Sequence, residues 1–248
     1  MLVLASLPLA YLLGAIPFSL IIGKSVKGID LREHGSGNLG ATNVYRNLGA
    51  WWGGLCLFLD VAKGAGAVLL TTAAVTLAPE GPLPLHLTGD IYRIIAGMLG
   101  TLGHSFSPFA SFRGGKGIAT TAGAFIVLEP LGLAVALLAF FSVFFATRIV
   151  SLASICAAAM LPVSVLFFEF RSGDPSLTLI IFTVVVAGLA IWRHRANIRR
   201  LQEGTEQKLA SPNGEDLDTA RAAADQALRD LAPPEPPLNA DVDPEDRT

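Results

Sequence analysis

The chain has 248 residues, of which 52% are hydrophobic and only 15% are charged, and its mean hydropathy is +0.56. A soluble domain cannot bury that much apolar surface. The composition therefore excludes an ordinary soluble enzyme and indicates an all-α polytopic membrane protein.

The formal net charge of −2 conceals an uneven distribution along the chain. Residues 209–248 hold ten acidic residues and three arginines, a net charge of −7, whereas residues 1–208 carry +5. The acidic segment is also rich in proline and poor in large apolar residues. We predict a transmembrane domain over 1–208 and a disordered cytoplasmic tail over 209–248.

Apolar segments that are candidates for membrane spans follow one another along the first 200 residues. The first lacks the positively charged leader and the A-x-A cleavage site of a signal peptide, so we expect it to remain as a helix with its N-terminus outside. The segments lie at 1–23, 50–78, 91–104, 118–168 and 177–192.

Charge placement decides how the 51-residue run from 118 to 168 is divided. A turn at Glu129-Pro130 and another at Arg148 give three helices, the first of them short, and seven helices in total. Most lysines and arginines then fall on the cytoplasmic side, as the positive-inside rule requires. A five-helix alternative, with one long tilted span in place of the first two, keeps the same orientation.

Two charged residues, Asp60 and Lys63, lie three positions apart inside the second apolar segment. Intramembrane charges are costly and often functional. We interpret this pair as structural, facing the helix bundle, because the small residues Gly64, Gly66 and Ala67 on the same helix would allow close packing.

Three polar, glycine-rich or basic segments fall on the cytoplasmic side of this topology. Glycine lets the backbone approach a ligand closely, and Arg and Lys supply charge and donors for phosphate oxygens. We therefore expect one anion-binding site formed by GSGNLGATNVYRNLG at 35–49, GHSFSPFASFRGGKG at 103–117 and RHRANIRRLQEGTEQK at 193–208.

Each segment also has a simpler interpretation when it is taken alone. The glycines of the first could only make turns, with Ser36 or Asn43 capping the next helix. The basic run at 193–200 could only anchor the topology, and His104 and His194 could be structural. The GGKG sequence is not a nucleotide P-loop, because the required Gly-x4-Gly-Lys-Ser/Thr spacing is absent.

Together, the patterns GSxNxGATN, GHxFxPFxxFxGGKGxAT and RHxxNIxRLxxGTExK resemble the signature motifs of the bacterial integral-membrane glycerol-3-phosphate acyltransferases that use acyl phosphate as donor. The resemblance covers roughly residues 1–208. It implies seven transmembrane helices in the bacterial inner membrane, a site facing the cytoplasm, and acyl transfer to the 1-hydroxyl of sn-glycerol 3-phosphate. The products would be lysophosphatidic acid and phosphate.

The residues agree with this chemistry. The chain lacks the His-x4-Asp signature of other glycerolipid acyltransferases, a GxSxG elbow and an activated cysteine, so we expect no covalent acyl-enzyme. An acyl phosphate is already activated, and the enzyme mainly has to align the acceptor hydroxyl and stabilise charge. The expected partners are glycerol 3-phosphate, acyl phosphate and the lipid bilayer, with no cofactor, metal or nucleic acid.

Roles for individual side chains follow from their charge and placement. Arg46 and Lys116 would neutralise substrate phosphates, and His104 would position the substrate or act as a general base. The predicted catalytic set is Ser36, Arg46, His104 and Lys116. The predicted substrate-binding set is Gly35, Asn38, Gly40, Thr42, Asn43, Gly114, Gly115, Gly117, His194, Asn197 and Glu206.

A membrane carrier of phosphorylated metabolites is the alternative function. Seven helices with intramembrane charges and anion-binding loops would also suit such a protein. The polar segments gather on one face rather than at the membrane midplane, however, and we find no internal repeat of the kind that alternating access requires. These two features favour the enzyme.

Overall fold

The computed structural model describes residues 1–78 and 82–209, and within these ranges the chain forms helices and connecting loops with no strand. It divides into a unit from Met1 to Lys208 and a second unit from Leu209 to Thr248. The predicted acidic tail, apart from Leu209, lies outside the described residues.

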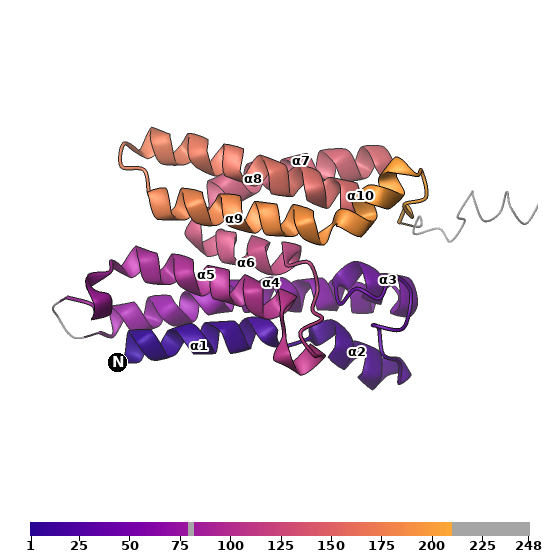
Figure 1. The fold of residues 1–248 in the computed structure, drawn as a ribbon, viewed down its shortest axis with the longest axis horizontal. Coiled ribbons are helices and arrows are strands. Elements are labelled where there is room, and N and C mark those ends of the chain that lie inside the picture. Colours follow the sequence, from indigo (N-terminus) through magenta and orange to yellow (C-terminus); the bar gives the residue numbers. More distant parts are fainter. Residues whose placement is uncertain (79–81, 210–248) are drawn as a thin grey trace, which may run out of the picture. The chain divides into compact units, whose positions relative to one another are not determined.

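The first unit contains ten α-helices and two short 3-10 turns within the described residues (Figure 1). The helices are α1 (Leu2–Ala15), α2 (Phe18–Lys27), α3 (Ala41–Leu48), α4 (Ala50–Thr76), α5 (Gly89–Ser105), α6 (Ile118–Leu128), α7 (Pro130–Thr147), α8 (Val150–Ser172), α9 (Leu177–Arg193) and α10 (Arg195–Gln202). The turns are η1 (Pro84–His86) and η2 (Pro108–Ala110).

Every predicted apolar segment is helical, but the helices differ in length. Four are long and apolar enough to cross a membrane: α1 with α2, α4, α7 and α8. The pair α9 and α10, bent by 55°, would make a fifth. Helix α6 has 11 residues and spans only about 16 Å, against roughly 30 Å for a bilayer core. By length and composition the protein is thus an all-helical polytopic membrane protein with four or five candidate spans.

The breaks between helices occur at residues that favour them. Ile16 precedes a proline and adopts an extended conformation, which separates α1 from α2. The Glu129 carboxylate accepts from the Gly132 N–H, and Pro130 follows as the first residue of α7. Arg148, with φ 61°, ends α7 in a left-handed conformation. The turns predicted at Glu129-Pro130 and Arg148 are confirmed.

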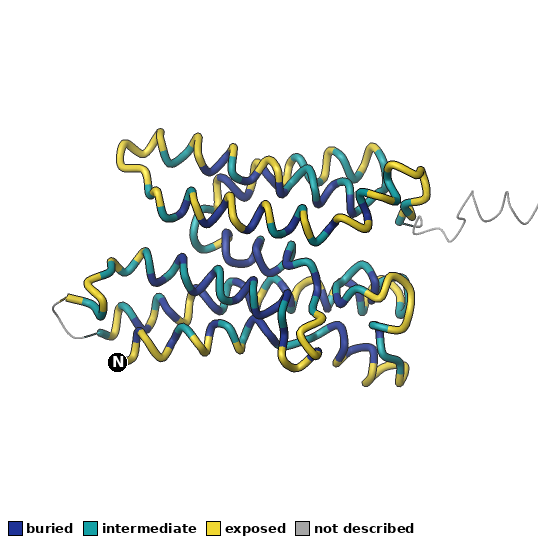
Figure 2. Tube along the Cα trace, viewed as in Figure 1, coloured by how far each residue is buried: buried dark blue, intermediate teal, exposed yellow. Residues whose placement is uncertain are grey.

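Helix α6 lies between two groups of helices. It packs against α4 and α5 on one side and against α7 on the other, while α1, α4 and α5 contact one another and α8 packs against α7 and α9 (Figure 1). Figure 2 shows α6 as largely buried. A side chain at Gly64 or Gly123 would collide with backbone across the α4–α6 contact, so glycine permits this close approach, as predicted for Gly64.

The outer helices present apolar side chains outward. Only Gly132, Leu133 and Ala136 are buried among the 18 residues of α7, while Phe141 and Phe145 are exposed. A helix that is apolar on all sides and exposed on most of them is suited to lipid contact.

The polar segments lie together at one end of the unit. The loop before α3, the loop between α5 and α6, and helix α10 all gather at the end opposite the N-terminus in Figure 1. The long helices thus bring three segments that are far apart in sequence to the same place.

Candidate active site

The loop before α3 is held in shape by Asn43. This buried side chain donates to the carbonyls of Leu31 and His34, at 3.0 and 3.1 Å, and its oxygen accepts from the backbone N–H of Ser36 at 3.1 Å. A side chain at Gly35 would collide with that oxygen. Asn43 therefore organises the glycine-rich loop from inside.

Other predicted residues of this loop are more accessible. Ser36 is exposed and Asn38 is half-buried, and the Asn38 N–H approaches the Ser36 hydroxyl at 3.5 Å. Gly40 is the N-cap of α3, and Thr42 follows in its first turn. Ser36 and Asn38 are thus available to a ligand, whereas Asn43 is occupied within the protein.

The first and second polar segments contact one another. Leu39 and Val44 share a buried cluster with Ala110 of η2. Gly115 lies so close to the Leu39 carbonyl and the His104 ring that a side chain there would collide with both. The absence of a side chain at Gly115 lets the two loops meet.

Arg193, at the end of α9, joins the second segment to the third. Its Nη2 donates to the carbonyls of Gly114 and Gly115 at 2.6 and 2.7 Å, with Ser105 O at 3.3 Å. The guanidinium also lies over the Phe106 ring, 5.4 Å from its centre. One forked cation therefore fixes the path of the GGKG loop.

Lys116 projects from this loop toward α10. Gly117 has φ +83°, a left-handed conformation that glycine adopts without strain, and it is the N-cap of α6. The Lys116 ammonium donates to the side-chain oxygen of Asn197 at 2.5 Å. The GGKG sequence thus ends one loop, begins a buried helix and places a cation between them.

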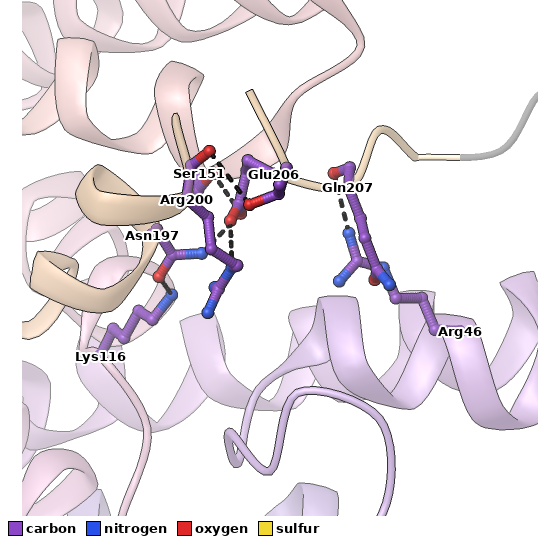
Figure 3. A network of polar contacts seen from close by, with 8 residues as sticks. Arg46, Lys116, Ser151, Asn197, Arg200, Glu206 and Gln207 are labelled. Carbon is purple, nitrogen blue, oxygen red and sulfur yellow. Dashed lines mark hydrogen bonds and ion pairs between the residues drawn. The ribbon is translucent and has the colours of Figure 1, made fainter. Parts of the chain in front are cut away.

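Glu206 lies next to Asn197, and its carboxylate accepts hydrogen bonds from several donors (Figure 3). Its Oε1 accepts from Ser151 at 2.7 Å and from the Asn197 amide at 2.6 Å, and its Oε2 accepts from Arg200 at 2.6 Å. Only 5% of the Glu206 side chain is exposed. This carboxylate ties α8, α10 and the following segment together.

Arg46, in the last turn of α3, reaches the same segment from the other side. Its Nη2 donates to the backbone carbonyl of Gln207 at 3.1 Å (Figure 3). Arg46 and Lys116 therefore both bind neutral oxygens, whereas Glu206 binds Arg200. Their positive charge is left without a carboxylate in direct contact among the described residues.

Burial shapes the electrostatics of these groups. Desolvation lowers the pKa of Lys116 to about 8, and the cations Arg200 and Arg46 add to this effect while Glu206 opposes it. Desolvation also lowers the pKa of Arg46. Burial alone would raise the pKa of Glu206, but hydrogen bonds from Ser151, Asn197 and Arg200 outweigh it and lower that pKa.

The two candidate histidines occupy different places. His194 lies at the bend between α9 and α10, with its Nδ1 2.7 Å from the Ala190 carbonyl and next in the chain to Arg193. His104 lies beneath the GGKG loop, with its Nδ1 3.6 Å from Asp60 of α4. His194 belongs to the Lys116 side of the site, and His104 faces the intramembrane ion pair.

An apolar groove of about 60 Å³ begins beside these polar groups. Ile118, the residue after Gly117, lines it together with Ala190, the partner of His194. It continues between α6, α7, α8 and α9, where Leu133, Ala136, Leu137, Phe140, Ala158, Leu161 and Val186 also line it.

Sequence reasoning assigned no individual role to three residues of this site. Arg193 and Arg200 lie within the third segment, for which the sequence predicts a basic, anion-binding character but no separate role for either arginine. Ser151 lies in an apolar run, and its position just after the Arg148 turn was the only signal. Ser151 contacts Glu206, 55 positions away, and Arg193 contacts Ser105, 88 positions away. Arg200 contacts Glu206, only six positions away, but this contact depends on how the chain turns after α10.

Known proteins with similar sequences decide the family. The model of a family described as glycerol-3-phosphate acyltransferase matches residues 4–204. The glycerol-3-phosphate acyltransferase of Bacillus cytotoxicus is 42% identical over 199 residues, covering 80% of this chain and 91% of that protein. The one from Bacillus subtilis strain 168 is 39% identical over 209 residues, covering 84% and 98%. The chain belongs to the glycerol-3-phosphate acyltransferase family.

Two solved structures from this family share the fold. A crystal structure of PlsY (YgiH), an integral membrane glycerol 3-phosphate acyltransferase in its glycerol 3-phosphate form, matches with a TM-score of 0.71 and 37% identity, covering 84% of this chain and 96% of that one. The lysophosphatidic acid form matches with a TM-score of 0.68 and 36% identity, covering 84% and 95%. The resemblance predicted from the three motifs is confirmed, and the chain is a membrane-embedded acyltransferase.

Proposed function

We propose that this glycerol-3-phosphate acyltransferase takes its acyl group from an acyl phosphate and transfers it to the 1-hydroxyl of sn-glycerol 3-phosphate. The products are lysophosphatidic acid and inorganic phosphate. One observation carries the proposal: Arg46 and Lys116, from two elements far apart in sequence, are held by neutral oxygens next to glycine-rich backbone. Such cations can exchange these weak partners for phosphate oxygens.

The reaction proceeds in one transfer without an acyl-enzyme. The hydroxyl oxygen attacks the acyl carbonyl carbon, the bond from that carbon to the phosphate oxygen breaks, and the hydroxyl proton leaves to a phosphate oxygen of the substrates. The protein supplies alignment and positive charge for the departing phosphate and the carbonyl oxygen. No side chain has to act as a nucleophile.

Each residue of the site has a role in substrate binding that follows from its position. Arg46 and Lys116 neutralise the two phosphates, and the backbone of the GGKG loop closes around one of them. Ser36 and Asn38 bind a phosphate or the acyl carbonyl from the exposed side of their loop, whose shape depends on Gly35, Gly40, Thr42 and Asn43. His194 and Asn197 contact glycerol phosphate from the α9–α10 side. Glu206 orients Arg200 directly and Lys116 through Asn197.

The apolar groove is the place for the acyl chain. It starts at Ile118 and Ala190, next to the GGKG loop and His194, and leads away between α6 and α9. A hydrocarbon chain lying there stays out of water, whereas exposing it to water would cost roughly 0.8 kcal/mol for each CH₂ group. The donor then reaches the site with its phosphate in the polar end and its chain among the helices.

We further propose seven transmembrane helices, with the N-terminus outside and the C-terminus in the cytoplasm of a bacterium whose inner membrane holds the protein. The short α6 counts as one of the seven, enclosed by α4, α5 and α7. The positive-inside bias supports this orientation, because it places the basic segments and the site on the cytoplasmic side. The acidic residues 209–248 form a cytoplasmic appendage that the reaction does not need.

Turnover by purified protein in detergent tests the function and the donor together. Acyl phosphate with glycerol 3-phosphate should give lysophosphatidic acid and one phosphate per turnover, whereas acyl-CoA or acyl-carrier protein should not. If only one of those thioesters supports turnover, the proposed donor is wrong. If acyl phosphate and both thioesters all fail to give lysophosphatidic acid, the proposed donor is also wrong.

A further inference from the structure

A chain of three buried titratable side chains, Lys63, Asp60 and His104, lies below the proposed site. Their exposed fractions are 3%, 2% and 8%. The Lys63 ammonium is 2.8 Å from the Asp60 carboxylate, and Asp60 Oδ1 is 3.6 Å from His104 Nδ1. None of them contacts Lys116 or Arg46 in the described structure, so the transfer step as proposed does not use them.

The lower end of this chain is anchored at the break between α1 and α2. The Lys63 ammonium donates to the carbonyl of Ile16 at 2.9 Å, and it lies 5.6 Å from the centre of the Phe18 ring. The Ile16 carbonyl precedes Pro17 at the end of α1. Lys63 thus fixes Asp60 relative to two helices besides its own.

The upper end of the chain meets the GGKG loop. The Gly114 N–H donates to the carbonyl of Ser105, and a side chain at Gly114 would collide with the His104 carbonyl. A side chain at Gly115 would collide with His104 Nε2. His104 and Gly115 also line, with Asp60 and Lys63, a cavity of about 10 Å³. The His104 residue therefore packs directly against the Gly114–Gly115 backbone of this loop.

Asp60 lies on the Nδ1 side of the His104 imidazole, whereas Gly115 lies on its Nε2 side. A carboxylate 3.6 Å from Nδ1 is a charge contact rather than a hydrogen bond. It still favours the tautomer with the proton on Nδ1, which leaves the Nε2 lone pair toward Gly115. Since Lys116 follows Gly115 directly, a turned or displaced ring would move the catalytic lysine.

We propose that Asp60 is a positioning residue that acts through His104, with Lys63 as its anchor, to set the placement of the Gly114–Gly115 backbone and hence of Lys116. This inference rests on the proposed function, because it assigns Lys116 to substrate phosphate. A purely structural ion pair would only hold α4 against its neighbours. The two roles predict different results when both charges are removed together. The value of kcat/KM falls if Asp60 is a positioning residue, and it stays unchanged if the ion pair is only structural.

The test is the double variant Asp60→Asn with Lys63→Met, which leaves no unpaired buried charge and retains similar volume. We expect it to fold and to lose on the order of a hundredfold in kcat/KM, as a displacement of about 1 Å in a reacting group can cause. His104→Asn should show a similar loss, and the triple variant should lose no more than either one. Wild-type kcat/KM in the double variant, or multiplied losses in the triple variant, would overturn the inference.

Controls separate positioning from stability and from the proposed donor. Thr71→Val removes a buried hydrogen bond between α4 and Ser6 of α1, far from the site, and should leave kcat/KM unchanged. Asp60→Glu keeps the charge but moves the carboxylate, so it should also slow turnover. This variant serves as the test if the double variant does not fold, and unchanged turnover of Asp60→Glu also contradicts the inference. Binding of glycerol 3-phosphate alone and of inorganic phosphate alone, each without donor, is the second readout. At least one of the two affinities should weaken in the Asp60 variants even if the proposed donor is wrong, and wild-type affinity for both would refute the positioning role.

Discussion

Asn197 stands between Lys116 and Glu206: its side-chain oxygen accepts from the lysine at 2.5 Å, and its nitrogen donates to the carboxylate at 2.6 Å. The amide thus connects opposite charges while keeping them from pairing directly. A direct Lys116–Glu206 ion pair would compete with an anionic substrate for the lysine. The insertion of a neutral side chain keeps the cation in place and available.

Replacing Asn197 by Asp should remove this separation. The new carboxylate would pair with Lys116 and repel Glu206, so both the charge offered to phosphate and the local order should decrease. We expect KM for a phosphate substrate to rise about tenfold or more, which corresponds to about 1.4 kcal/mol. Steady-state kinetics in each substrate measure it, and an unchanged KM for both would show that Lys116 does not bind phosphate.

Lys116→Ala should reduce kcat/KM by about 10²-fold to 10³-fold, because a charge that stabilises the departing phosphate is lost. Lys24→Ala is the matched control, since this lysine is exposed on α2, and it should keep wild-type activity. Thermal unfolding of both variants should resemble wild type. Near-normal turnover by a folded Lys116→Ala protein would remove the lysine from the site.

The affinity for anionic substrate should depend on pH through Lys116. Burial lowers the pKa of this lysine to about 8 in the free protein. Below that pH the ammonium is charged and binds phosphate; above it the free protein loses the charge, so KM should rise with increasing pH. Lys116→Arg should shift or abolish this rise, because a guanidinium stays charged. Equal pH profiles for the two proteins would assign the titration to another group.

Filling the apolar groove should select against long acyl chains. Ala136 and Ala187 line the groove, and Ala187→Phe should lower kcat/KM for a long-chain acyl phosphate by about tenfold relative to a short-chain one. Val184→Phe, on the exposed side of the same helix, is the control and should leave the ratio unchanged. Equal losses for both chain lengths would place the acyl chain elsewhere.

Deleting residues 210–248 should leave turnover intact, since the described contacts of Glu206 and Gln207 are all with residues that the deletion retains. Turnover of the shortened protein in detergent and in liposomes measures this. Lost activity in either setting would identify the acidic segment as a regulatory element.

The fold and most of the site could be read from local patterns. Hydrophobic runs located the long helices, and Glu129-Pro130 and Arg148 located the turns within the longest run. The short helices α3 and α10 lie instead in the polar and basic segments. The glycine-rich and basic segments were expected to converge, and contacts such as Arg193 with Gly114 and Lys116 with Asn197 show that they do.

What sequence could not supply was the partner of each side chain. The sequence predicts that Asn43 binds substrate, yet its side chain makes its hydrogen bonds inside its own loop. The Asp60–Lys63 pair was expected to hold helices together, which the contact with Ile16 supports, but its neighbour His104 is 41 or more positions away. Such contacts depend on how helices cross, and no local pattern encodes that.

The groove between α6 and α9 also bears on kinetics. An enzyme whose donor enters such a groove from the surrounding lipid or micelle responds to the mole fraction of donor in that lipid or micelle. The bulk concentration of the donor does not set its rate. Adding inert detergent at constant total donor should therefore slow the reaction by surface dilution, while glycerol 3-phosphate, which arrives from water, continues to follow its bulk concentration.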